Sequence, residues 1–227
     1  MNTQEELFEK HYSDLYSHLI EFIVHVYEDG LGSEELDWCE DEFVAQLGMI
    51  YANSLQSEFE TITEQLDVES DTVLKSHVDF NANVLVYRKE NYDRLKRILD
   101  THAENITGLM KQGLQISDII LAVLPDMVTL AMSEVQIAIE RASVYAGKIL
   151  QKATGIKIYK VWHSVNDELT CDTCKALDGT VVGVDEAFVK GDIDEDVDLS
   201  GLDYTGGDIA YAHPRCRCWV TYTTKEV

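Results

Sequence analysis

Hydrophobic positions recur every three to four residues over most of the first 153 residues. This spacing puts apolar side chains on one face of an α-helix. Together with serine or aspartate at the starts and glycine at the ends, it predicts helices up to about residue 27, over 34–66, and from Ser70 or Asp71 to about Gly113. We therefore expect a body of long amphipathic helices.

Pro125 interrupts the next periodic stretch, which begins at Ser117. Proline lacks an amide hydrogen and clashes with the preceding turn inside a helix, but it is favoured in a helix's first turn. The pattern thus predicts a short helix over 117–124 and a separate helix over about 126–153, which ends at Gly155.

After Gly155 the pattern changes to short alternating runs rich in β-branched and aromatic residues, at 156–163, 179–184 and 218–223. Such runs predict β-strands. We place a boundary near residue 154, between a helical body (1–153) and a small β-rich module (154–227). The expected fold class is α+β, mainly helical, with the small module following the helical body.

Charge narrows the range of partners. The chain has 42 acidic and 18 basic residues and a formal net charge of −24. Such a surface repels phosphate, and the longest basic run is only Arg94–Arg97, so tight nucleic-acid binding is not expected. The acidity favours a soluble protein that binds other proteins.

The first ten residues are polar, without the basic start and apolar run of a secretory signal. The longest apolar run, Ile119–Leu124, is too short to span a bilayer. We therefore expect synthesis in a cytosol and no membrane partner. Disulfides are disfavoured there, so the four cysteines in the last quarter of the chain indicate a metal site.

The candidate ligands are Cys171 and Cys174, in a CxxC motif, and His213, Cys216 and Cys218, in HPRCRC. Five donors compete for the four positions of a tetrahedral zinc ion. His213 and Cys216 have chelating spacing, whereas Cys216 and Cys218 would face the same way on a strand. A structural Zn²⁺ joining the two motifs would close and stabilise the small module.

A CxxC motif can also be a redox pair, but that needs a βαβ context with the motif at a helix start, and we expect strand, turn and strand here. Catalytic zinc of the deaminase type needs a P-C-x-x-C spacing that HPRCRC lacks. Alternating carboxylates at 192–203 approach a calcium loop. Val197 replaces the required glycine and Asp203 the final glutamate, so specific Ca²⁺ binding is not expected.

Residues 115–223 resemble the phage Mu F-type minor head protein family, also called head morphogenesis proteins. The resemblance rests on a small-residue-Ser-Glu helix entry, a tryptophan strand, an aspartate before CxxC, an Asp-Gly turn and a closing HPxCRC. The matching residues are Ser133, Glu134, Trp162, Asp167, Cys171, Cys174, Leu177, Asp178, Gly179, His213, Pro214, Cys216, Arg217 and Cys218. Met132 departs from an arginine common in the family, and the first hundred residues match nothing recognisable.

The resemblance implies a structural, non-enzymatic virion protein that associates with the portal or capsid in head assembly and can leave with the genome. It also implies Cys216 as the fourth zinc ligand, with Cys218 as the alternative, because other residues often occupy the last position. A zinc enzyme or toxin-like effector, and a host-side protein-binding regulator, are the alternatives. Co-purification with portal or capsid separates these classes.

Three motif residues also have roles expected from their chemistry. The Asp167 carboxylate can fold back onto the amides of the turn that follows it. Asp178 and Gly179 predict a tight hairpin turn before the second strand. Arg217, pointing away from its neighbouring cysteines, could pair with Glu134 and dock the module on the long helix.

Overall fold

The structure is a computed structural model that describes residues 3–32, 34–68, 80–188, 207–213 and 215–225. The chain forms two compact units. Unit 1 comprises residues 1–50 and 81–135, and unit 2 comprises residues 51–80 and 136–227. The expected boundary near residue 154 separates segments that we expect to fold independently. The compact units do not test it, so it remains a prediction.

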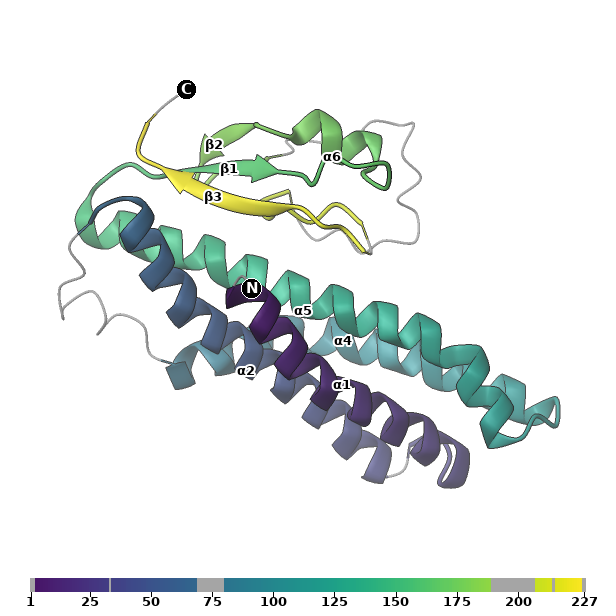
Figure 1. The fold of residues 1–227 in the computed structure, drawn as a ribbon. Coiled ribbons are helices and arrows are strands. Elements are labelled where there is room, and N and C mark those ends of the chain that lie inside the picture. The colour runs from purple at the N-terminus through teal and green to yellow at the C-terminus, as the bar shows by residue number, and fades with distance from the viewer. Residues whose placement is uncertain (1–2, 33, 69–79, 189–206, 214, 226–227) are drawn as a thin grey trace. The chain divides into compact units, whose positions relative to one another are not determined.

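Four long helices account for most of the chain: α1 (Thr3–Glu28), α2 (Glu34–Gln65), α4 (Phe80–Lys111) and α5 (Ile116–Thr154) (Figure 1). The mostly helical architecture is as predicted. Gly30 and Gly113 follow α1 and α4 with φ of 83° and 86°, a left-handed conformation that glycine adopts without strain and that ends a helix. The predicted start of the third helix, at 70–79, lies outside the described residues.

Helix α5 corrects the prediction of a break at Pro125. The helix runs without interruption from Ile116 to Thr154, with Pro125 inside it. Pro125 is exposed, and so is Leu121, whose carbonyl group loses its helical partner because proline has no amide hydrogen. Water can satisfy that carbonyl at an exposed site, so the proline costs energy without ending the helix.

Unit 1 is a helical unit with an apolar core. Buried residues of α4 lie three or four positions apart, which puts them on one face. They are Tyr87, Asn91, Leu95, Leu99, Ala103 and Ile106. A buried ion pair joins two of the helices: Arg94 on α4 donates two hydrogen bonds, of 2.7 and 2.5 Å, to the carboxylate of Glu134 on α5.

Among the described residues, α5 is the one helix long and apolar enough to cross a membrane by length and composition alone. A helix that packs in a protein core meets the same criteria. The six-residue run at 119–124 therefore understated the apolar length of this segment, because the apolar residues continue past Pro125.

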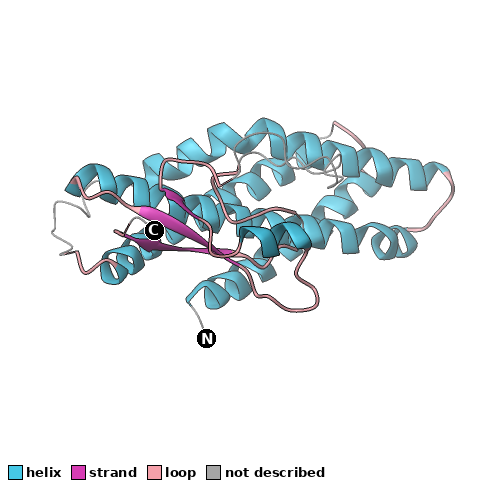
Figure 2. Cartoon of the chain, turned by 90° about the horizontal axis from the view of Figure 1, so that it is seen from above, coloured by secondary structure: helices cyan, strands magenta, loops and turns pink. Residues whose placement is uncertain are grey.

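Unit 2 contains a three-stranded antiparallel sheet with strand order β2-β1-β3 (Figure 1). Figure 2 shows strands of this sheet in magenta. The strands are β1 (Tyr159–His163), β2 (Val181–Gly183) and β3 (Trp219–Thr223). All three predicted strands are present, and β1 lies between the other two. The central strand thus pairs with the segments that follow the two cysteine motifs.

One face of this sheet packs against the second half of α5. Lys160 and Trp162 on β1, and Val220 and Tyr222 on β3, are buried at alternate positions. Gly147 of α5 lies beneath them: a Cβ atom there would come within 2.9 Å of Val184 Cγ2 and 3.0 Å of Tyr222 Cε1. The missing side chain therefore lets helix and sheet approach closely.

Polar groups are also buried between α2, α5 and the sheet. Ser143 Oγ donates to Glu58 Oε2 over 3.0 Å and lies 2.9 Å from Tyr222 Oη. Lys160 Nζ donates over 2.5 Å to the carbonyl oxygen of Asp208. Burial lowers the pKa of Lys160 to about 8, because desolvation penalises the charged amine more than Asp208 favours it.

Candidate metal centre

The CxxC motif begins a short helix, α6 (Asp172–Leu177). Cys171 is the N-cap residue, and its sulfur accepts a hydrogen bond from the Cys174 amide over 3.3 Å. The expected strand-turn-strand setting is therefore wrong: a short helix, α6, lies between β1 and β2. The two strands are antiparallel neighbours, so the parallel βαβ context of a redox pair is not formed here either.

A tight turn leads from α6 into β2. Asp178 has φ −55° and ψ 129°, Gly179 has φ 76°, and the Thr180 amide donates to the Leu177 carbonyl over 2.9 Å. These values define a type II turn, which needs glycine at its third position. The Asp-Gly pair thus forms the predicted tight turn, but between a helix and a strand instead of within a two-residue hairpin.

The second donor segment approaches β3 through another turn. The Cys216 amide donates to the His213 carbonyl over 3.0 Å, and Arg215 lies in the left-handed region with φ 63°. From there the side chains alternate: Cys216 and Cys218 are buried and Arg217 is exposed. The two cysteines face the same way, as predicted from their spacing. Pro214 lies outside the described residues.

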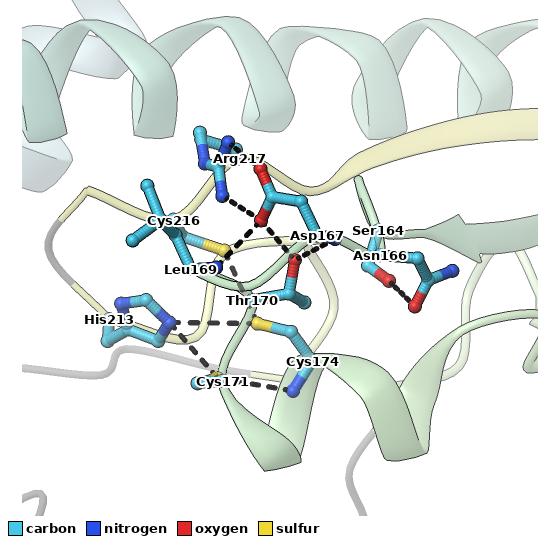
Figure 3. Close-up of polar contacts among 10 residues, drawn as sticks. All are labelled: Ser164, Asn166, Asp167, Leu169, Thr170, Cys171, Cys174, His213, Cys216 and Arg217. Atoms are coloured by element: carbon cyan, nitrogen blue, oxygen red, sulfur yellow. Dashed lines mark hydrogen bonds and ion pairs between the residues drawn. The ribbon is translucent and has the colours of Figure 1, made fainter.

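Figure 3 shows how the two segments bring their donor atoms together. His213 Nε2 lies 3.2 Å from Cys171 Sγ and 3.7 Å from Cys174 Sγ. Cys216 Sγ lies 3.7 Å from Cys174 Sγ. All four predicted ligands are therefore neighbours, although about forty residues separate the two motifs in sequence.

The three spacings are close to those around a tetrahedral ion, although no four of the five donors lie within 4.8 Å of one another. With Zn–S bonds of about 2.3 Å and Zn–N bonds of about 2.0 Å, two sulfur ligands lie about 3.8 Å apart and a sulfur and a nitrogen about 3.5 Å apart. The donors form two overlapping triads, Cys171–Cys174–His213 and Cys174–Cys216–Cys218, within each of which all atoms lie within 4.8 Å. Cys174 belongs to both triads, so it is the centre of the donor set.

Cys216 and Cys218 differ in what they face. A small pocket is lined by Cys171, Cys174, His213 and Cys218, together with other side chains such as Leu169 and Arg217, and Cys216 is not among its lining residues. The Cys216 sulfur instead lies 3.8 Å from the Ala210 carbonyl oxygen. Hence Cys174 and Cys218 face the pocket, and Cys216 lies behind them.

The chemistry of the cluster favours a cation. Contact with the thiols of Cys174 and Cys218 holds the pKa of Cys216 well below its ordinary value. The same contact raises the pKa of Cys174. Four thiols and an imidazole are a donor set for a soft or borderline metal ion.

An ion pair connects the two donor segments. Arg217 donates two hydrogen bonds, of 2.6 and 2.5 Å, to the Asp167 carboxylate, which also accepts 3.0 Å bonds from the Leu169 amide and the Thr170 hydroxyl. Arg217 thereby holds the pKa of Asp167 well below its usual range. The fold-back of Asp167 is as predicted.

The expected pairing of Arg217 with Glu134 is wrong. Glu134 has Arg94 as its partner within unit 1, and Arg217 has Asp167 within unit 2. Sequence reasoning missed Arg94 because its partner is 40 positions away and nothing local indicates it. The contact between Asp167 and Thr170 has a local signal in the sequence, since an aspartate and a threonine three positions apart often share hydrogen bonds in a turn.

The remaining motif residues form the base of the site. Trp162 is fully buried and packs edge-on against Phe188, with ring centroids 5.2 Å apart. Asp178 accepts 2.7 Å hydrogen bonds from the Ser164 amide and the Asn166 side chain, and the Ser164 amide in particular lowers its pKa. The acidic segment at 192–203 lies outside the described residues.

The sequence model of one protein family, described as Phage Mu protein F like protein, matches residues 100–221. The matched region contains all five donor residues. No curated protein and no solved structure matches the chain.

Proposed function

Because the chain belongs to the Phage Mu protein F like family, we propose that it is a structural minor head protein that acts in phage head morphogenesis. The match covers more than half of the chain and includes both cysteine motifs, the Asp167–Arg217 pair and the α5 residue Glu134. This family membership is the observation that carries the proposal.

In this role the protein binds the portal or capsid during assembly and is a virion component made in the host cytoplasm. The acidic surface, with a net charge of −24, favours protein partners over duplex DNA. The helical residues before the small module provide the larger surface. A standard interface needs about 800 Å² from each partner, which a module of this size can hardly supply alone.

Analysis of purified particles tests the function. Phage heads are purified from a producing culture, and each protein is quantified by mass spectrometry relative to the portal. We expect this chain in few copies per head and in complexes pulled down with the portal. If it is absent from both heads and assembly intermediates, the minor head assignment is wrong.

We further propose that the cluster binds one structural Zn²⁺ through Cys171, Cys174, His213 and Cys216, with Cys218 as the alternative fourth ligand. The spacing of three donor pairs supports this set: 3.2 Å for His213–Cys171, and 3.7 Å for both His213–Cys174 and Cys174–Cys216. Four protein ligands leave no open coordination position for a reacting water, which is the arrangement of structural zinc sites.

Elemental analysis of protein purified without chelator tests the metal. We expect one zinc per chain in the native protein and in Cys218→Ser, and loss of zinc in Cys216→Ser. Zinc loss in Cys218→Ser with retention in Cys216→Ser would assign the fourth ligand to Cys218. A native protein without metal would contradict the zinc proposal.

A further inference from the structure

The donor cluster holds more thiols than one metal ion needs, and two of them are already in contact. The sulfur atoms of Cys174 and Cys216 lie 3.7 Å apart, at van der Waals distance, and both residues are buried. Cys174 comes from α6 and Cys216 from the turn before β3, 42 positions later. A bond between them would join the same two segments that a shared metal ion joins.

We propose that Cys174 and Cys216 are a site of reversible oxidation, at which a disulfide replaces the metal as the link that closes the module. This inference rests on the proposed zinc site, whose ligands it shares. The oxidant belongs to the class of small peroxides, with hydrogen peroxide as the simplest member.

The pocket sets the order in which the two proposed partners react. Cys174 lines it, as Cys171 and Cys218 do, and Cys216 does not, so of the pair Cys174 meets a small oxidant first. Bound to zinc, both sulfurs are thiolates. The Cys174 thiolate attacks a peroxide oxygen, the O–O bond breaks, and with one proton from solvent a sulfenic acid and one water form. The Cys216 thiolate then attacks the Cys174 sulfur, the S–O bond breaks, and with a second proton a second water leaves. In total, two thiolates, two protons and one hydrogen peroxide give one disulfide and two waters.

Oxidation also changes metal binding. A Cys174–Cys216 disulfide removes two of the four proposed ligands, including the one that both donor triads share. Cys171, His213 and Cys218 remain, and they no longer have Cys174 to bring them around one ion. Zinc is therefore released as the disulfide forms, and the covalent bond keeps α6 attached to the segment before β3.

Replacement of the bound zinc by a disulfide suits a protein that passes from a reducing to an oxidising environment. Thiols stay reduced in a cytosol, where a metal can hold the segments together, whereas disulfides persist on particles in an oxidising medium. A head protein made in a cell and released in a particle meets both conditions. The module would then stay closed in each of them.

The test uses the full-length zinc-loaded protein and about one equivalent of hydrogen peroxide. Cross-linked peptides are identified by mass spectrometry without reduction, and released zinc is measured with a chromogenic chelator. We expect Cys174–Cys216 as the main linked pair, with zinc release in proportion to it and reversal of the disulfide by thiol reductant. Cys39→Ala, which removes the cysteine outside the donor cluster, is the matched control and should form the same disulfide.

Each other outcome has a defined meaning. A main link between Cys171 and Cys174 or between Cys174 and Cys218, or oxidation to sulfinic acid without a link, would overturn the inference. Zinc bound but no Cys174–Cys216 link would contradict only the oxidation site. A link without any zinc in the purified protein would contradict the metal proposal instead. Because the link is mapped in the native chain, the test does not depend on a variant that folds.

Discussion

At the scale of single residues, the structure assigns partners to charged side chains that the sequence left open. Arg217 lies between two candidate ligands, and its guanidinium group binds Asp167, four positions before Cys171. This pair ties the loop before α6 to the segment before β3. Its role is to position the two donor motifs, since neither side chain is itself a metal ligand.

Asp167→Asn should therefore weaken metal binding without removing a ligand. The asparagine amide cannot accept two charged hydrogen bonds from Arg217. The two donor segments are then no longer held at a fixed distance from each other, so we expect about tenfold weaker zinc affinity. Competition with a zinc indicator dye measures it. Glu168→Gln, the exposed neighbour, is the control and should bind zinc like the native chain. Unchanged zinc affinity in Asp167→Asn would contradict the positioning role of the Asp167–Arg217 pair.

Lys160 predicts a rise in stability with pH. Its pKa falls from 10.5 to about 8 on folding, because burial desolvates the amine. Between these two values the unfolded chain binds more protons than the folded chain, so the free energy of unfolding increases as pH rises from about 8 to 10.5. The full effect is on the order of 3 kcal/mol.

The comparison with Lys160→Met isolates this effect. Urea unfolding at several pH values should show the native chain gaining stability relative to the variant across that window, since the variant has no amine to titrate. Lys148→Met, which removes an amine 3.8 Å from the Asp208 carboxylate, is the control and should keep the pH dependence. Parallel curves for the native chain and Lys160→Met would contradict the lowered pKa.

At the scale of elements, α5 shows how a local rule gives way to the surrounding structure. Proline usually ends or kinks a helix, yet α5 continues through Pro125 for 29 further residues. Buried residues on both sides of it, Val123 and Met127, stay on one helical face. The packing of that face therefore outweighs the local cost of the proline.

Pro125→Ala should stabilise the protein by about 1–3 kcal/mol, because alanine restores the missing amide donor inside a continuous helix. Thermal and urea unfolding measure the change. In a helix that began at residue 126, as the sequence pattern suggested, proline would be favourable and alanine would give no gain. Thr129→Ala, one turn later on the same helix, is a suitable comparison. A destabilised Pro125→Ala would speak against the continuous helix.

At the scale of the whole molecule, the donor cluster belongs entirely to unit 2, and unit 1 has a separate apolar core. Metal binding to the folded state alone stabilises it by about 2.7 kcal/mol when the metal exceeds its dissociation constant a hundredfold. The loss of metal should therefore affect the two units unequally.

Chelation of the full-length protein should lower the melting temperature and remove the sheet signal, while most of the helical circular dichroism remains. The helices keep their own apolar contacts, whereas the small sheet depends on the linked donor segments. Added Zn²⁺ should restore the signal, and Mg²⁺ should not, because it prefers oxygen ligands. A complete loss of helix on chelation would show that the boundary near residue 154 does not separate independent folding units.

Much of the molecule was readable from the sequence because it depends on local spacing. The apolar period predicted the long helices, their glycine ends at Gly30 and Gly113, and the three strands. The clustering of the cysteine and histidine donors was also predicted, since such residues at chelating spacing have few other uses in a reducing compartment. Which four of them bind zinc remains a prediction. The family resemblance is confirmed by the match over residues 100–221.

The tertiary structure decided what depends on residues far apart in the chain. It paired Glu134 with Arg94 and Arg217 with Asp167, choices among many charges that no local pattern distinguishes. It carried α5 through Pro125, because packing along the whole helix outweighs one lost hydrogen bond. It also placed Cys174 between the two donor triads, because only the pairing of β3 with β1 brings the second motif beside α6.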